Sequence, residues 1–173
     1  MYGNGVEDWD NPELWFEGCA LVFRTEHQAL SETYSREREA LRVNTTLPTG
    51  EELSFSPGAH NVLQREIIED YTGNLHRPRV LYVGDASDRE LYLQSNILEE
   101  LGVEVDSSTL LPDVIILEEH PQYGIIMHLV EAYHSVGQFD DTRVKQIREM
   151  FSSCKVRLLM VTALGTWKEV RGI

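Results

Sequence analysis

The sequence predicts an α/β fold in which a mixed central β-sheet is flanked by helices. Short apolar runs alternate with amphipathic segments from residue 56 onward, as expected for strands separated by helices. Two of these runs, residues 113–118 and 124–131, follow each other closely and should pair antiparallel. Strands joined through helices should instead run parallel to their neighbours. Hydrophobic residues make up 42% of the 173-residue chain, which is enough for one ordinary core.

The N-terminal part of the chain has the least regular pattern. Residues 1–20 are rich in Gly, Asn, Asp and Trp and should form a loose arm. Residues 23–43 carry apolar side chains near helical spacing, which predicts a helix that packs on another surface. The turn "PTG" between "TTL" and "EELSF" predicts a small hairpin or an extended connector. We therefore expect residues 1–50 to be an arm and helix left from a preceding domain, and residues 51–173 to be the α/β domain.

A helix should begin at Ser56 and Pro57 and run to about Tyr71. The serine can cap free backbone N–H groups, and proline suits the first helical turn. Residues 79–85 form a short apolar run that predicts a buried strand. Residues 88–101 should form another helix, which the glycine that follows would end.

The C-terminal half supplies the remaining elements. Strands are expected at residues 113–118 and 124–131, an amphipathic helix at 140–154, and a last buried strand at 156–164. His128 should lie on the opposite face of its strand from Glu131, so we interpret it as a packed or hydrogen-bonded core residue.

The chain is strongly acidic, with 29 Asp and Glu against 15 Lys and Arg and a formal net charge of -14. Proteins that bind DNA usually present a basic face, so this charge does not itself favour nucleic-acid binding. It favours a solvated acidic surface, and the small number of lysines suggests adaptation to high salt; the rival explanation is an acidic surface that mimics DNA. No apolar stretch approaches the roughly 18 residues of a membrane span, and the N-terminus lacks a signal-peptide pattern. We expect a soluble, cytoplasmic protein without membrane contact.

Two carboxylates stand at the ends of the paired strands. Asp113 opens the first strand and Glu131 closes the second, so a hairpin would place both at the same end and on one face. Carboxylates held close together repel each other, and a bound divalent cation relieves that repulsion. Mg²⁺ in such a site can activate water and stabilise charge on a phosphodiester. The alternative is that both acids are merely solvated strand ends.

Five segments, covering most of residues 54–163, resemble a known family in content and order. They are "SFSPGAHNVLQREIIEDY", "RVLYVGDASDRELY", "LPDVIILEE", "MHLVEAYHSVGQFDDTRV" and "VRLLMVTAL". The stretch is similar to the C-terminal catalytic domain of the BsuBI/PstI family of type II restriction endonucleases, within the PD-(D/E)xK nuclease superfamily. The resemblance implies a restriction-endonuclease-like core and Mg²⁺-dependent cleavage of double-stranded DNA at a short palindrome by a homodimer.

The resemblance also assigns residues. Asp113 corresponds to the aspartate of the PD element and Glu131 to the second acid, and both are implied to be catalytic metal ligands. Glu66 or Glu69 could add an acid from the first helix. Contacts to the substrate are implied for four polar side chains: His60, Asn61, Gln64 and Ser135.

The chain departs from the superfamily pattern at Tyr133, where a lysine normally follows the second acid by two residues. A basic group from the next helix could substitute, and the candidates are Arg143 and Lys145, which could equally be solvated. The chain also looks shorter than the family at both ends. Two alternatives therefore stay open: a truncated inactive relative that keeps the fold and some DNA binding, or an acidic protein-interaction module.

Overall fold

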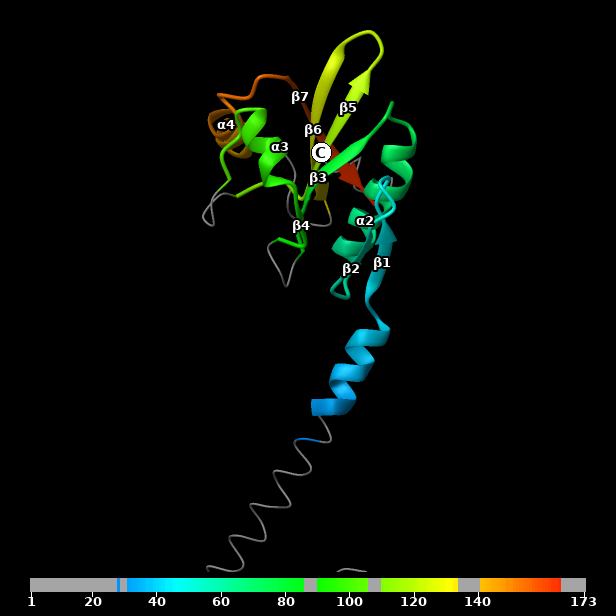
Figure 1. The fold of residues 1–173 in the computed structure, drawn as a ribbon. Helices are drawn as coiled ribbons and strands as arrows, with labels where there is room; N and C mark the ends of the chain where they lie inside the picture. Colours follow the sequence, from blue (N-terminus) through cyan, green and yellow to red (C-terminus); the bar gives the residue numbers. More distant parts are fainter. Residues whose placement is uncertain (1–27, 29–30, 86–89, 106–109, 134–140, 166–173) are drawn as a thin grey trace, which may run out of the picture. The chain divides into compact units, whose positions relative to one another are not determined.

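The structure is a computed structural model that describes residues 28, 31–85, 90–105, 110–133 and 141–165 (Figure 1). The chain divides into two compact units, Met1–Leu41 and Arg42–Ile173. In the first unit, residues 31–40 are helical, as expected, and their side chains are exposed. The arm expected at residues 1–20 lies outside the described residues. The division falls after Leu41, so the boundary expected at residue 50 lies inside the second unit.

The second unit begins with the expected hairpin. Strand β1 (Val43–Thr46) pairs antiparallel with β2 (Glu52–Phe55), and Gly50 in the turn has a φ of +92°. Val43 lies opposite Phe55, and both side chains are buried in the same hydrophobic cluster. The hairpin is therefore part of the α/β domain rather than of the N-terminal segment.

A five-stranded mixed sheet forms the centre of this unit, in the strand order β4-β3-β5-β6-β7 (Figure 1). Its strands are β3 (Arg79–Val83), β4 (Tyr92–Leu93), β5 (Val114–His120), β6 (Gly124–Tyr133) and β7 (Arg157–Leu164). As expected, β5 and β6 pair antiparallel, and β7 runs parallel to β6 after a helical connection. The fold class predicted from the sequence is confirmed.

The connection between β3 and β5 differs from the prediction in two ways. Residues 88–101 were expected to form one helix, but they contain β4 and the shorter helix α3 (Ser95–Glu100). Backbone N–H groups of Leu91 and Gln94 bond to carbonyls of β3, so this part adds to the edge of the sheet. Because β4 first turns back along β3, the chain reaches β5 beside the end of β3, and the two strands pair antiparallel rather than parallel.

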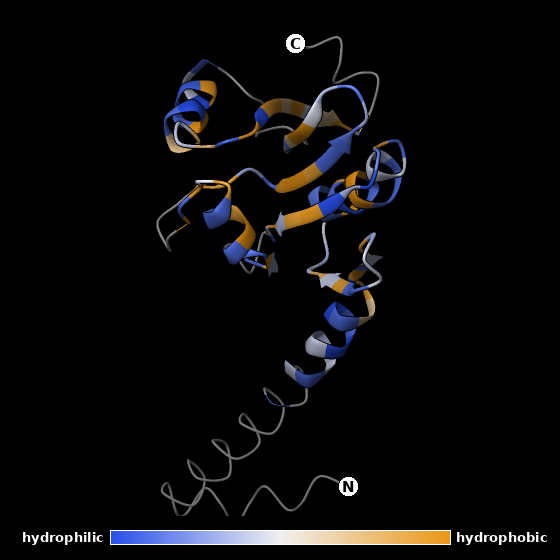
Figure 2. Ribbon diagram, turned by 45° about the horizontal axis from the view of Figure 1, so that its top comes forward, coloured by the Kyte–Doolittle hydropathy of each residue, from blue (hydrophilic) through white to orange (hydrophobic). Residues whose placement is uncertain are grey.

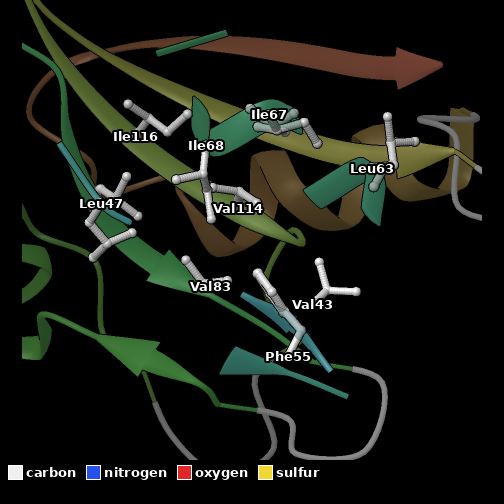
Figure 3. Close-up of a cluster of buried hydrophobic side chains, with 12 residues drawn as sticks. Val43, Leu47, Phe55, Leu63, Ile67, Ile68, Val83, Val114 and Ile116 are labelled. Atoms are coloured by element: carbon white, nitrogen blue, oxygen red, sulfur yellow. The ribbon is translucent and has the colours of Figure 1, made fainter. Parts of the chain in front are cut away.

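Helices cover the two faces of the sheet and bury a separate hydrophobic cluster on each (Figures 1 and 2). On one face lie α2 (Ala59–Glu66), the π-helical turn η2 (Ile67–Tyr71) and the β1–β2 hairpin, whose core is drawn in Figure 3. On the other lie α3 and α4 (Asp141–Met150). No helix among the described residues is long and apolar enough to cross a membrane.

The start of α2 corrects one expectation. Ser56 was expected to cap this helix, but the N-cap position is Gly58, and no side chain there bonds to the free N–H groups. The Ser56 hydroxyl instead donates a hydrogen bond to Asp85 at 2.6 Å. The helix still ends near the expected residue, because η2 continues it to Tyr71.

His128 is a hydrogen-bonded core residue, as expected. It is 2% exposed, with Nδ1 2.8 Å from the Tyr71 hydroxyl and Nε2 3.0 Å from Glu118 Oε2. Burial alone would raise the pKa of Glu118, but hydrogen bonds from the His76 N–H and from His128 outweigh it and hold that pKa below its usual value. This network ties η2 to β5 and β6 on the opposite face from Glu131.

Gly102, which ends α3, offers a test of local packing. Its φ is +84°, and a Cβ at this position would lie 2.3 Å from the Ser153 carbonyl oxygen. We expect Gly102→Ala to lower the free energy of unfolding by about 1–3 kcal/mol or more, because the strain of a positive φ angle and the clash with the backbone add together. The matched control is Gly73→Ala, where φ is ordinary and space is open. Urea unfolding should show a large loss only for Gly102→Ala; equal effects would contradict the packing described.

Candidate active site

The two predicted acids lie together at one end of the sheet. Asp113 directly precedes β5 and Glu131 lies near the end of β6, and the register pairs Val114 with Val130. The pKa of Glu131 is raised to about 7, mainly by burial and in addition by the negative charge of Asp113. The two acids therefore influence each other at the shared end of the strands that the hairpin predicted.

Both oxygens of Asp113 have partners. Oδ2 accepts a hydrogen bond from the Ala132 N–H at 2.8 Å, and Oδ1 lies 3.4 Å from Nε2 of His60. The hydrogen bond to Asp113 is the main cause that raises the pKa of His60; burial opposes it, and the charges of Asp113 and Glu131 add to the increase. His60 comes from the first turn of α2 and is partly exposed, so the site joins that helix to the strand ends.

Glu131 is 5% exposed and is held by Arg143 of α4. Arg143 Nε and Nη2 lie 2.8 and 2.7 Å from Glu131 Oε1. The same guanidinium donates hydrogen bonds to the backbone carbonyls of Leu110 and Leu111, each at 3.0 Å. Arg143 therefore links Glu131 to the segment that leads into Asp113, and its charge opposes the increase in the pKa of Glu131.

Several other expected residues do not join this group. The Lys145 side chain is 78% exposed and lies 3.9 Å from Glu149 one turn along α4. Glu66 and Glu69 are exposed, and Glu69 accepts a hydrogen bond from Thr45. Within the described residues, no set of three or more His, Cys, Asp or Glu side chains is arranged to hold a metal ion. Ser135 lies outside the described residues.

Asn61 and Gln64 were expected to contact substrate, but both side chains are 1% exposed and lie inside the protein. Gln64 Nε2 lies 3.3 Å from Nε2 of His60, the nitrogen that also faces Asp113. Because Gln64 is buried and its side-chain amide lies beside this ring nitrogen, it contacts His60 rather than substrate.

One contact of the site has no side-chain signal in the sequence. The Ala132 N–H that holds Asp113 is a backbone donor, and its role depends on where β5 meets β6. The only sequence signal for it is the strand pairing itself, which places residue 132 near the entry of the preceding strand.

Comparison with known proteins decides the family. The family model described as the BsuBI/PstI restriction endonuclease domain matches residues 43–172. The chain belongs to this family. The resemblance found in its motifs is thereby confirmed, and the chain is a type II restriction endonuclease-like domain.

Relatives of this BsuBI/PstI domain include two curated enzymes. The chain is 29% identical over 154 residues to the type II restriction enzyme BsuBI of Bacillus subtilis, covering 88% of the chain and 48% of the relative. It is 24% identical over 156 residues to the type II restriction enzyme AplI of Arthrospira platensis, covering 86% of the chain and 47% of the relative. The chain spans about half the length of these relatives.

A solved structure has the same fold. The SdaI restriction endonuclease matches with a TM-score of 0.69 and 26% sequence identity, over 80% of this chain and 43% of that chain. Enzymes with the restriction-endonuclease fold are typically metal-dependent. The mixed sheet and its helices are therefore those of a restriction-endonuclease core.

Proposed function

We propose that this BsuBI/PstI domain hydrolyses phosphodiester bonds of double-stranded DNA at a short specific site, using Mg²⁺ bound by Asp113 and Glu131. The observation that carries the proposal is that these two acids lie at the same end of the paired strands β5 and β6, where the charge of Asp113 raises the pKa of the buried Glu131. A buried acid beside a second acid is an unfavourable arrangement that the charge of Arg143 offsets only in part, and acids with raised pKa values are concentrated at functional sites.

The residues at the site fit a magnesium ion. Mg²⁺ is usually bound through one or two carboxylates, with water and phosphate oxygens as its remaining ligands. Asp113 and Glu131 would supply two carboxylates, which agrees with that preference. When bound there, the ion would polarise the scissile phosphate and favour ionisation of an attacking water.

The side chains around the two acids would divide the remaining work. Arg143 holds Glu131 and brings a permanent positive charge next to the acids. In the superfamily pattern a lysine at the position of Tyr133 would supply this charge. His60 places a partly exposed imidazole beside Asp113, where it can donate a hydrogen bond to a phosphate oxygen of bound DNA. Lys145 is 78% exposed and pairs with Glu149, and two residues after Arg143 on a helix it faces a different side, so we assign it no catalytic role.

We further propose that the active form is a homodimer in the cytoplasm. A short palindrome presents two equivalent cleavage positions, which a two-fold symmetric pair of active sites can address. The net charge of -14 opposes association with DNA at low ionic strength. Cleavage should therefore tolerate raised salt, which screens this repulsion.

The test is incubation of the protein with supercoiled plasmids of different sequence, with Mg²⁺ or with EDTA, at low and at high salt. We expect linear products with the same ends in every plasmid that shares the site, and no products with EDTA. Intact plasmid together with measurable DNA binding would instead support an inactive relative. No cleavage and no DNA binding at any salt would support an acidic interaction module.

A further inference from the structure

The start of α2 is fastened to the end of β3 by a small polar network. Among the described residues, Asp85, which follows β3, accepts hydrogen bonds from the Ser56 N–H at 3.0 Å, from the Ser56 hydroxyl at 2.6 Å, and from Asn61 Nδ2 at 2.7 Å. Asn61 Nδ2 also donates to the Ser56 carbonyl at 2.8 Å. Because the carbonyl and the carboxylate can only accept, the orientation of the Asn61 amide is fixed.

This network replaces an ordinary helix cap. No side chain caps α2 at Gly58, and the first turn of a helix frays unless its free groups are held. Asn61 lies in that first turn and is 1% exposed, so its side chain holds the turn from inside. His60 is its direct neighbour on the helix. The position of His60 therefore depends on the Asn61–Asp85 contact.

The same network reaches Asp113 from a second direction. The N–H of Gly84, the residue before Asp85, donates to the Asp113 carbonyl at 2.9 Å. His60 approaches the carboxylate of that same residue at 3.4 Å. Asp113 thus contacts the end of β3 through Gly84 and the start of α2 through His60, and Asp85 joins these two elements. A shift of α2 relative to β3 would therefore move His60 relative to Asp113.

We propose that Asp85 and Asn61 are positioning residues that set His60 against Asp113 and so hold the acid pair in its cation-binding arrangement. This inference rests on the proposed function. Asn61 is buried, so a substrate contact does not explain the "HN" part of the family resemblance. The proposal gives a role to this asparagine and to the aspartate of "VGD". Neither residue touches the reacting groups; both act through the backbone of α2 and β3.

The experiment uses Asp85→Asn, because both Asp85 oxygens accept hydrogen bonds and an amide would place a donor against a donor. The first readout is the affinity of the metal-free protein for Mn²⁺ by titration calorimetry, which needs no catalysis. Outer-shell partners of metal sites typically change affinity or activity by about 10–100-fold, so we expect a Mn²⁺ dissociation constant raised roughly tenfold or more. The second readout is plasmid cleavage, where kcat should fall while KM stays within about threefold.

A matched control cuts a similar network elsewhere in the unit. In the β1–β2 hairpin, Arg42 donates to Ser54 and Ser54 donates to Asn44. Ser54→Ala should leave the Mn²⁺ affinity and kcat unchanged. Ser56→Ala removes the hydroxyl that bonds to Asp85 and Asn61 but keeps the Ser56 N–H bond to Asp85, so it should have a smaller effect of the same kind. This variant replaces Asp85→Asn as the test if Asp85→Asn does not fold.

The outcomes separate the two proposals. If the wild-type protein binds Mn²⁺ and a folded Asp85→Asn, or Ser56→Ala in its place, keeps the same affinity and kcat, the positioning role is refuted while the proposed function stands. A loss of unfolding free energy with unchanged Mn²⁺ affinity would also refute it, because that is the result of a purely structural tie. If the wild-type protein itself binds no Mn²⁺ and leaves plasmid intact, the proposed function fails, and the positioning role fails with it.

Discussion

Asp113→Asn is expected to reduce Mg²⁺-dependent plasmid cleavage by on the order of 10³-fold or more, while the protein stays folded. The asparagine oxygen can still accept the Ala132 N–H, so the local backbone contact is kept. What is lost is the negative charge that would bind the cation. Cleavage rates from single-turnover plasmid assays, with circular dichroism to verify folding, measure the effect.

The matched control for this variant is Glu119→Gln. Glu119 lies on the same strand, but its side chain is 57% exposed and pairs with Arg77 at the surface, far along β5 from the acid pair. It should cleave at the wild-type rate. Glu131→Gln should lose as much activity as Asp113→Asn, and the double variant little more, because the two acids act as one unit. Full cleavage by Asp113→Asn would remove the acids from the mechanism.

Arg143→Ala is expected to lower the free energy of unfolding by about 3–5 kcal/mol at pH 8, as for other buried ion pairs that lose one partner. The Glu131 side chain is 7% exposed, and without the guanidinium, which lowers its pKa, it must either stay charged in the interior or take up a proton at pH 8, and both cost free energy. The carbonyls of Leu110 and Leu111 would also lose their donor. Arg143→Lys should recover only part of the loss, because an ammonium cannot reproduce the several hydrogen bonds of the guanidinium.

The same loss should depend on pH. The pKa of Glu131 is raised to about 7 in the folded protein, from 4.5. A carboxyl group with a raised pKa binds more protons folded than unfolded, so its contribution to stability is complete below about 4.5 and is lost as pH rises through about 7. At pH 6 Glu131 can be neutral, and losing Arg143 should then matter less.

Urea unfolding of the metal-free protein at pH 6 and pH 8 measures this difference. The double variant Arg143→Ala/Glu131→Gln should recover most of the stability lost at pH 8, because no buried charge remains. Arg148→Ala, an exposed position on the same helix, should have little effect at either pH. An equal loss for Arg143→Ala at both pH values would contradict the described environment of Glu131.

Long apolar strands were the most predictable part of the fold. The runs that became β5, β6 and β7 are apolar along their length, and the short connection between the first two requires an antiparallel pair. β4 was missed because two residues carry no periodic signal, and its place depends on hydrogen bonds to β3. The direction of β5 relative to β3 follows from that same short strand.

The candidate site also contains residues that could be placed from the sequence and residues that could not. Asp113 and Glu131 could be placed together from the hairpin alone, since strand pairing brings the entry of β5 next to the exit of β6. The partner of Glu131 depends on how α4 packs, which left Arg143 and Lys145 equivalent in the sequence. The substrate contact that the resemblance implies for Asn61 differs from its buried position, because a polar side chain gives no signal in the sequence that it will be buried against a carboxylate following another strand.

The most direct test of the central claim is a crystal structure with Mn²⁺, using anomalous diffraction to locate the ion. The account predicts one strong peak about 2–2.6 Å from a carboxylate oxygen of Asp113 and one of Glu131. Ordered crystals that contain Mn²⁺ but show no peak between these acids, or a peak held by other residues, would contradict it.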